Sequence, residues 1–231
     1  MTALELPARW GDPAAALAEV GARLARGPAT DLVLLPEAAL TGYVSPTGDF
    51  DLRRFAEPRD GTTAGALAAL AARHRVHVIG PLIERAGDAC HNAMLGFGPD
   101  GAPTLAYRKR HPWQPETWAT PGADAHPLLR LGELTVTIAT CYDLHFVATE
   151  AADVLAAADL LLFPSAWVDR HATRVPMLRA LAARFGVAVV NANWAPGVVR
   201  LPGQGGSCVI GADGAVRAVA PAGDRADATL P

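Results

Sequence analysis

Five short apolar runs recur along this chain of 231 residues, and alanine-rich segments with helical spacing separate them. The runs are almost continuously apolar and occupy residues 32–35, 76–79, 135–139, 160–163 and 187–190. Such strands are typical of a sheet covered on both faces, because a solvated face would place polar residues at alternate positions. Strands that alternate with helices predict an α/β fold.

The alanine-rich segments carry residues that begin and end helices. Asp12 can cap the first helix, Pro13 fits its first turn, and Gly27 can end it. The apolar stripe of this helix that we expect to face the core consists of Leu17, Val20 and Leu24. The remaining predicted helices span residues 64–75, 147–157 and 174–185.

Two hairpin patterns distinguish the chain from a simple parallel sheet. Residues 93–97 and 104–107 flank a turn at residues 99–101, and a second pattern has its turn at Asp213 and Gly214. Hairpins combined with βα units predict a mixed sheet or a two-sheet sandwich flanked by helices. The sequence has no internal repeat and no linker, so we expect residues 1–231 to form one domain.

Composition and charge exclude several classes of protein. The formal net charge is −3, which does not predict a surface for nucleic acid or for a polybasic membrane contact. No apolar run approaches the roughly 20 residues that span a bilayer, and the first residues do not resemble a signal peptide. Three cysteines are too few for a disulfide scaffold, so we expect a cytoplasmic protein. No nucleotide-binding loop and no serine-hydrolase elbow is present.

Three residues that can carry chemistry follow predicted strands, where the reactive groups of α/β proteins collect. They are Glu37, Lys109 and Cys141. Each residue alone has an ordinary structural explanation: a solvated carboxylate, a surface cation and a buried thiol. Together they suffice for acyl transfer through a thioester, because a carboxylate can move the thiol proton and an ammonium can stabilise an oxyanion. We also expect the N-terminus of a following helix to favour the thiolate of Cys141.

Four blocks of sequence resemble the nitrilase superfamily of carbon–nitrogen hydrolases. The blocks are LVLLPEAALTGY, YRKRHPWQPETWATPG, TVTIATCYDLHF and ADLLLFPSAW, and the similarity extends over nearly the whole chain. The resemblance implies a four-layer α-β-β-α sandwich that pairs into a homodimer. It also implies hydrolysis of non-peptide carbon–nitrogen bonds without a metal or an organic cofactor.

Residue by residue, the resemblance implies a general base at Glu37, an oxyanion stabiliser at Lys109 and a nucleophile at Cys141. Glu116 matches a second glutamate of the family that positions the lysine and the substrate. The backbone N–H of Tyr142 is expected to share the oxyanion site with Lys109. The sequence Cys-Tyr-Asp is similar to the amidase, ω-amidase and carbamoylase branches, so we expect a small amide or N-carbamoyl substrate.

The chain departs from the family pattern at His145, where an arginine is frequent. That arginine is associated with a substrate carboxylate, so its loss argues against monoamides of dicarboxylic acids. His145 contacts the substrate instead or is a neutral histidine without such a role. An acyltransferase, a nitrile hydrolase and a non-catalytic scaffold remain as alternatives.

Aromatic residues near the predicted strand ends can form a substrate pocket or pack in the core. They are Tyr43, Trp113, Trp118, Trp167 and Trp194, of which Trp167 and Tyr43 are included in the predicted substrate site. Cys208 lies in an apolar strand and is expected in the core. Cys90 and His91 have no second pair of ligands, so they do not predict a zinc site.

Overall fold

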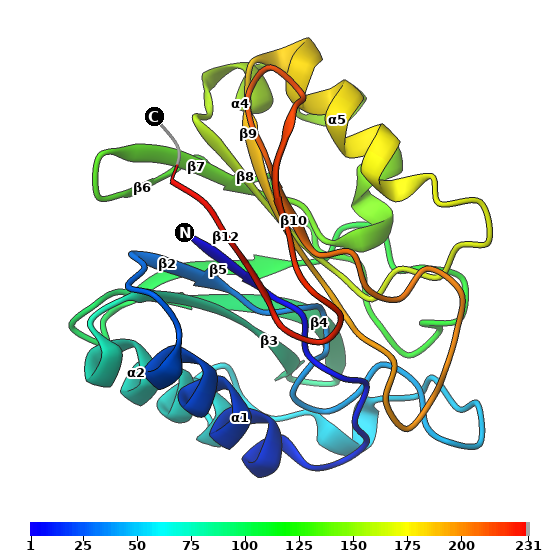
Figure 1. Cartoon of the computed structure of the whole chain (residues 1–231). Coiled ribbons are helices and arrows are strands. Elements are labelled where there is room, and N and C mark those ends of the chain that lie inside the picture. Colours follow the sequence, from blue (N-terminus) through cyan, green and yellow to red (C-terminus); the bar gives the residue numbers. More distant parts are fainter. Residues whose placement is uncertain (230–231) are drawn as a thin grey trace.

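The computed structural model describes residues 1–229, which form two six-stranded sheets packed face to face (Figure 1). The first sheet is parallel at its centre and antiparallel at both sides. Its strands, in spatial order, are β12 (Arg225–Asp227), β1 (Thr2–Leu4), β2 (Leu32–Leu34), β3 (His77–Ala86), β4 (Ala89–Phe97) and β5 (Pro103–Arg108).

The second sheet has the same mixed character, with three parallel strands flanked by antiparallel ones. In spatial order its strands are β11 (Val216–Val219), β10 (Cys208–Ile210), β9 (Ala188–Asn193), β8 (Leu160–Ser165), β7 (Leu134–Ile138) and β6 (Leu129–Leu131). The five predicted strands and both predicted hairpins are therefore present, distributed over two sheets. The expectation of mixed sheets is confirmed.

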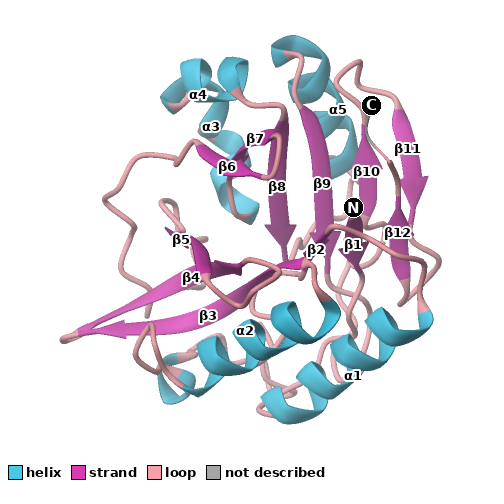
Figure 2. Cartoon of the chain, turned by 90° about the vertical axis from the view of Figure 1, so that its left-hand side faces the viewer, coloured by secondary structure: helices cyan, strands magenta, loops and turns pink. Residues whose placement is uncertain are grey.

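Helices cover the outer face of each sheet (Figure 2). The first sheet carries α1 (Pro13–Arg26) and α2 (Thr62–His74), and the second carries α3 (Val147–Glu150), α4 (Ala152–Ala157) and α5 (Arg174–Phe185). Three apolar layers hold the four layers of backbone together: one between the sheets and one beneath each set of helices. The predicted α-β-β-α sandwich is confirmed.

Local signals explain where the helices begin and end. The Asp12 carboxylate accepts a hydrogen bond of 2.9 Å from the backbone N–H of Ala15, and the N–H of Gly27 closes the last turn of α1. Val20 is fully buried beneath the first sheet. Gly186 follows α5 with φ of 67°, a conformation that glycine adopts without strain.

The prediction of one helix over residues 147–157 is wrong. The chain leaves the helical conformation at Ala151, so two short helices replace the continuous one. Val147, Ala151 and Leu155 are nevertheless all buried in the layer beneath the second sheet. The apolar spacing that predicted the helix is thus satisfied by a broken segment. Strands β1, β6 and β12 were not predicted, because each has only three residues and, unlike the equally short β2 and β10, lies outside the apolar runs and hairpin patterns of the sequence.

The buried carboxylate of Glu84 connects β3 with β5 and with the loop before α2. Glu84 on β3 accepts hydrogen bonds of 2.9 Å from Arg59 and 2.8 Å from Arg108. Burial raises the pKa of Glu84, but the hydrogen bonds of the two guanidinium groups outweigh burial and lower it to about 2. A pKa below that of the unfolded chain means that Glu84 stabilises the fold above about pH 4.5, and this contribution is lost as the pH falls toward 2.

We therefore expect Glu84→Gln to lower the free energy of unfolding by about 2 kcal/mol at pH 7. The difference between variant and wild type should shrink when urea unfolding is repeated near pH 3. An equal difference at both pH values would show that the loss comes from packing and not from the charge of Glu84.

Candidate active site

The two sheets together supply the three predicted catalytic residues. Glu37 follows β2 and Lys109 follows β5 in the first sheet, whereas Cys141 follows β7 in the second. Their exposed fractions are 1%, 1% and 6%, so all three lie inside the molecule. The structure brings the three residues together where the two sheets meet.

Lys109 lies between two carboxylates. Its ammonium donates hydrogen bonds of 2.7 Å to Glu37 and 2.6 Å to Glu116. Burial lowers the pKa of Lys109, but the attraction of the two carboxylates outweighs burial and raises it, so the lysine stays charged. Burial and the charge of Glu37 raise the pKa of Glu116, and Lys109 opposes them. The predicted position of Glu116 beside the lysine is what the structure shows.

Lys109 is the only lysine of the chain, and the other 19 cationic residues are arginines. A compact ammonium can form hydrogen bonds to both carboxylates in this enclosed space. A guanidinium is larger and planar and fits a different geometry. The geometry of the two carboxylates therefore favours lysine over arginine at this position.

Asn92 was not predicted, yet it joins the two carboxylates. Its side-chain amide on β4 donates hydrogen bonds of 2.8 Å to Glu37 and 2.6 Å to Glu116. It is 1% exposed. In the sequence, Asn92 is only a polar residue near the start of a largely apolar strand. Such residues occur in many hairpins, so this pattern does not identify a site residue.

The second oxygen of Glu37 reaches the other sheet. It accepts a hydrogen bond of 2.9 Å from the backbone N–H of Ala166, in the segment that follows β8. Glu37 is thereby held from both sheets. Its orientation toward Cys141 does not depend on the lysine alone.

Cys141 begins a 3₁₀ turn, Cys141–His145, with φ of 49°. This left-handed conformation is uncommon for a residue with a side chain and is found at functional sites. Burial raises the pKa of the thiol well above its ordinary value. The carboxylate of Glu37 raises it further, and the charge of Lys109 opposes these effects. The expected stabilisation of a thiolate by a helix N-terminus is not met, because burial and the nearby carboxylates of Glu37 and Glu116 outweigh the effect of the short 3₁₀ helix that Cys141 begins.

A cavity of about 80 Å³ opens above the thiol. Its lining consists of Trp113, Cys141, Tyr142, His145, Ala166, Trp167 and Val168. The rings of His145 and Trp167 stack with their centroids 5.8 Å apart. Roughly 10–15 Å³ is needed to hold one water, so the cavity accepts a group of a few heavy atoms.

Three of the four predicted substrate residues line this cavity: Tyr142, His145 and Trp167. Tyr43 does not line it. Its ring packs against Trp113 and Trp194, and its hydroxyl has no hydrogen-bond partner in the described part of the chain. Trp118 is buried among apolar residues near these rings.

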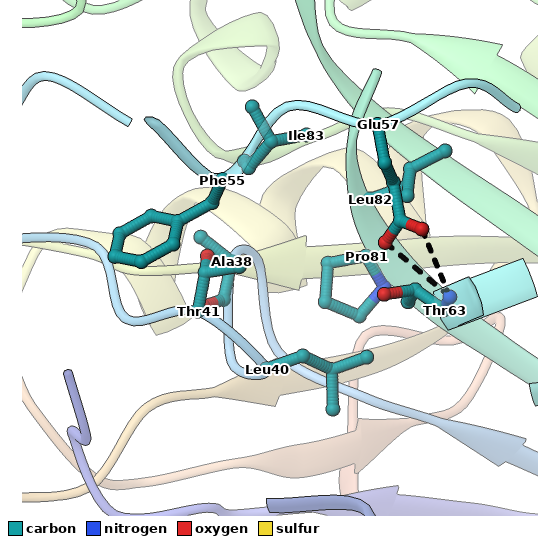
Figure 3. Close-up of a pocket in the computed structure, with 9 residues that line it drawn as sticks. All are labelled: Ala38, Leu40, Thr41, Phe55, Glu57, Thr63, Pro81, Leu82 and Ile83. Carbon is teal, nitrogen blue, oxygen red and sulfur yellow. Dashed lines mark hydrogen bonds between the residues drawn. The ribbon is translucent and has the colours of Figure 1, made fainter. Parts of the chain in front are cut away.

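A second hollow, next to Ala38, is not a ligand site (Figure 3). Its volume of about 10 Å³ has space for about one water. Glu57 accepts hydrogen bonds there from the backbone N–H of Thr63, in the first turn of α2 (Figure 3). The carboxylate therefore caps a helix.

Residues 1–229 contain no cluster of three or more His, Cys, Asp or Glu side chains that could hold a metal ion. None of their helices combines the length and the hydrophobicity that a membrane crossing requires. Cys208 is buried in β10, where burial raises the pKa of its thiol to about 11.

The four-layer sandwich is the fold of the carbon–nitrogen hydrolases. The sequence profile of the carbon–nitrogen hydrolase family matches residues 5–229. The chain belongs to this family, within the nitrilase superfamily.

Relatives and solved structures agree with this assignment. A hydrolase in the pqqF 5′ region of Pseudomonas protegens is 31% identical over 139 residues, which cover 59% of this chain and 48% of that protein. A nitrilase of Pyrococcus abyssi is 29% identical over 151 residues, 65% of this chain and 57% of that protein. The chain thus spans about half the length of the curated relatives it matches.

Among solved structures, a mutant of the Nesterenkonia amidase from the nitrilase superfamily has a TM-score of 0.84 at 21% identity. A superfamily protein of Xanthomonas campestris with an arsenic adduct in its active site has a TM-score of 0.80 at 25% identity. Each comparison covers 97% of this chain and 87% of the other. This chain therefore has the same sandwich fold as these proteins.

Proposed function

We propose that the chain is a cysteine amidase that cleaves a small amide or an N-carbamoyl compound through a thioester. The observation that carries this proposal is the buried ammonium of Lys109, held between Glu37 and Glu116 beside the thiol of Cys141. In a glutamate-to-glutamine mutant of the Nesterenkonia amidase, the active-site cysteine carries covalent adducts of acrylamide and of the acetamide moiety of fluoroacetamide. That chemistry supports the same role for Cys141.

In the proposed first half-reaction, the sulfur of Cys141 attacks the substrate carbonyl while its proton passes to Glu37. The raised pKa of the thiol favours transfer during the attack over a standing thiolate. The carbonyl oxygen becomes an oxyanion next to the Lys109 ammonium and the backbone N–H of Tyr142. When the carbon–nitrogen bond breaks, Glu37 returns the proton to the departing nitrogen.

In the second half-reaction, Glu37 takes a proton from water, and the resulting hydroxide attacks the thioester carbonyl. The carbon–sulfur bond breaks, the acid leaves, and the proton returns to the sulfur of Cys141. Glu116 and Asn92 keep the ammonium and the base in place throughout. An amine or alcohol in place of water would make the same site an acyltransferase.

The cavity supports an uncharged acyl group. Its lining has aromatic and apolar side chains, together with Cys141 and His145, and neither lysine nor arginine is among them. A substrate carboxylate placed there would lose water without gaining a cationic partner, which costs several kcal/mol. Neutral amides and N-carbamoyl amines are therefore preferred over monoamides of dicarboxylic acids.

The test is ammonia release from a panel of neutral amides, N-carbamoyl amines, nitriles and dicarboxylic monoamides. We expect the first two classes to react and the last two to react poorly. Turnover of nitriles alone would replace the proposal by a nitrilase. Product that appears only with an added amine or alcohol would replace it by an acyltransferase.

The same panel tests the position of His145. We expect His145→Arg to increase kcat/KM for a dicarboxylic monoamide about tenfold, because an arginine can form a charge-assisted hydrogen bond with the free carboxylate. The neutral amide of the same chain length serves as the matched substrate and should not improve. Equal effects on both substrates would show that residue 145 does not contact the acyl group.

A further inference from the structure

Asp143 is a buried charge that the proposed reaction does not use. It lies two residues after Cys141 and is 0% exposed. One carboxylate oxygen accepts hydrogen bonds of 2.7 Å from the Tyr107 hydroxyl and 3.0 Å from the backbone N–H of Thr140. The other accepts one of 2.8 Å from the backbone N–H of His111. No ion pair of Asp143 is formed within residues 1–229, so these three donors stabilise its charge.

The three donors come from two sheets. Tyr107 belongs to β5, at the edge of the first sheet, and His111 lies two residues beyond Lys109. Thr140 follows β7 in the second sheet and immediately precedes Cys141. The carboxylate therefore connects the segment that carries the lysine with the turn that carries the nucleophile.

Asp143 is the buried link between the segment after Lys109 and the second sheet. At the exposed surface, Arg110 and His111 of the same segment also bond Glu150 on α3. The side chains that hold the Lys109 ammonium, Glu37 and Glu116, and the amide of Asn92 that joins them all come from the part of the chain before β6. They fix the lysine relative to the first sheet. The hydrogen bond of Glu37 to Ala166 fixes the base relative to the second sheet, but it does not fix the loop that begins at Lys109.

We infer that Asp143 is a positioning residue, which sets the separation of the Lys109 ammonium and the Cys141 sulfur across the junction of the sheets. The inference rests on the proposed function. The oxyanion forms between these two groups, so an error in their separation weakens its stabilisation more than it weakens binding of the substrate. A misplacement of about 1 Å in such a site lowers the rate about 100-fold.

The principal test is Asp143→Asn. An amide has one acceptor oxygen, so its NH₂ group must face either His111 or the pair formed by Tyr107 and Thr140, and at least one donor is lost. We expect kcat to fall about 100-fold while KM stays within about threefold. Tyr107→Phe removes a single donor, and we expect it to lower kcat about tenfold.

Glu5→Gln is the matched control. Glu5 is also a buried carboxylate, 1% exposed, and it accepts hydrogen bonds of 2.9 Å and 2.8 Å from the backbone N–H groups of Ser207 and Gly223. It does not line the cavity above Cys141. We expect this variant to lose thermal stability comparable to that of Asp143→Asn and to keep the wild-type kcat.

Two outcomes overturn the inference. One is a kcat of Asp143→Asn within about threefold of wild type; the other is an equal loss of kcat in Glu5→Gln. A second measurement tests the positioning role separately from the proposed function: alkylation of Cys141 by iodoacetamide, followed by peptide mass spectrometry. If wild type hydrolyses no amide, the proposed function fails. A rate of alkylation that is about tenfold lower in Asp143→Asn, and in no other variant, then still supports the positioning role, whereas an unchanged rate rejects it.

Discussion

Cys141→Ala should abolish ammonia release, with kcat lowered by at least about 10⁴-fold, because removal of a covalent nucleophile leaves only binding and oxyanion stabilisation. The fold should be retained. Alanine has the same Cβ as cysteine, so the left-handed backbone at φ of 49° is no more strained than before. Thermal unfolding of the variant should therefore resemble that of wild type, and its loss of activity can be assigned to chemistry.

Cys90→Ala is the matched control, since Cys90 is free and half-buried and does not line the cavity. We expect it to keep wild-type activity. Fluoroacetamide offers a second measurement: intact mass should show one acetamide adduct on wild type and on Cys90→Ala, and none on Cys141→Ala. More than about 1% of wild-type activity in Cys141→Ala would place the nucleophile elsewhere, since a site without its nucleophile keeps far less.

Lys109→Met should damage both activity and stability. The oxyanion loses its charged partner, which lowers kcat about 10³-fold. Glu37 and Glu116 also lose the ammonium between them while remaining buried, which should lower the free energy of unfolding at pH 7 by about 3–5 kcal/mol. Lys109→Arg should restore little of either property, because the larger guanidinium does not fit the space between the two carboxylates.

The stability loss of Lys109→Met should depend on pH. Burial already raises the pKa of Glu116, and removal of the opposing lysine raises it further. The unfolded chains titrate alike, so the deficit grows with pH between the folded-state pKa of Glu116 in wild type, which already lies above 4.5, and its higher folded-state pKa in the variant. Urea unfolding of wild type and Lys109→Met at pH 4.5 and pH 7.5 measures this change. A deficit independent of pH would show that packing, not charge, dominates.

The positions of the catalytic candidates were predictable because a residue that directly follows a strand must lie at the carboxyl end of that strand. Glu37, Lys109 and Cys141 each follow an apolar run, and sheets place such ends together. The role of Asn92 was not predictable, since its partners Glu37 and Glu116 lie 55 and 24 residues away in the sequence. The same limit applies to Asp143, whose hydrogen bonds to Tyr107 and His111 exist only after the two sheets pack.

The ionisation of Cys141 shows a different limit of sequence reasoning. A cysteine between a strand and a helix suggests a lowered pKa, but the sequence does not reveal how deeply the thiol is buried or how close the carboxylates lie. The broken helix at Ala151 has a related cause. Its apolar spacing records which residues face the core, and two short helices satisfy that spacing as well as one.

The proposed catalytic residues are divided between the two sheets, so the proposed activity requires both sheets to be assembled. As the ribosome extends the chain, the glutamates and the lysine emerge before the cysteine, so we expect no amide hydrolysis by a nascent chain until the second sheet has docked. In refolding experiments, the return of ammonia release would time that docking step, whereas circular dichroism would follow the individual sheets and helices. A chain severed in the exposed segment around residues 123–125 would regain activity only when its two fragments associate.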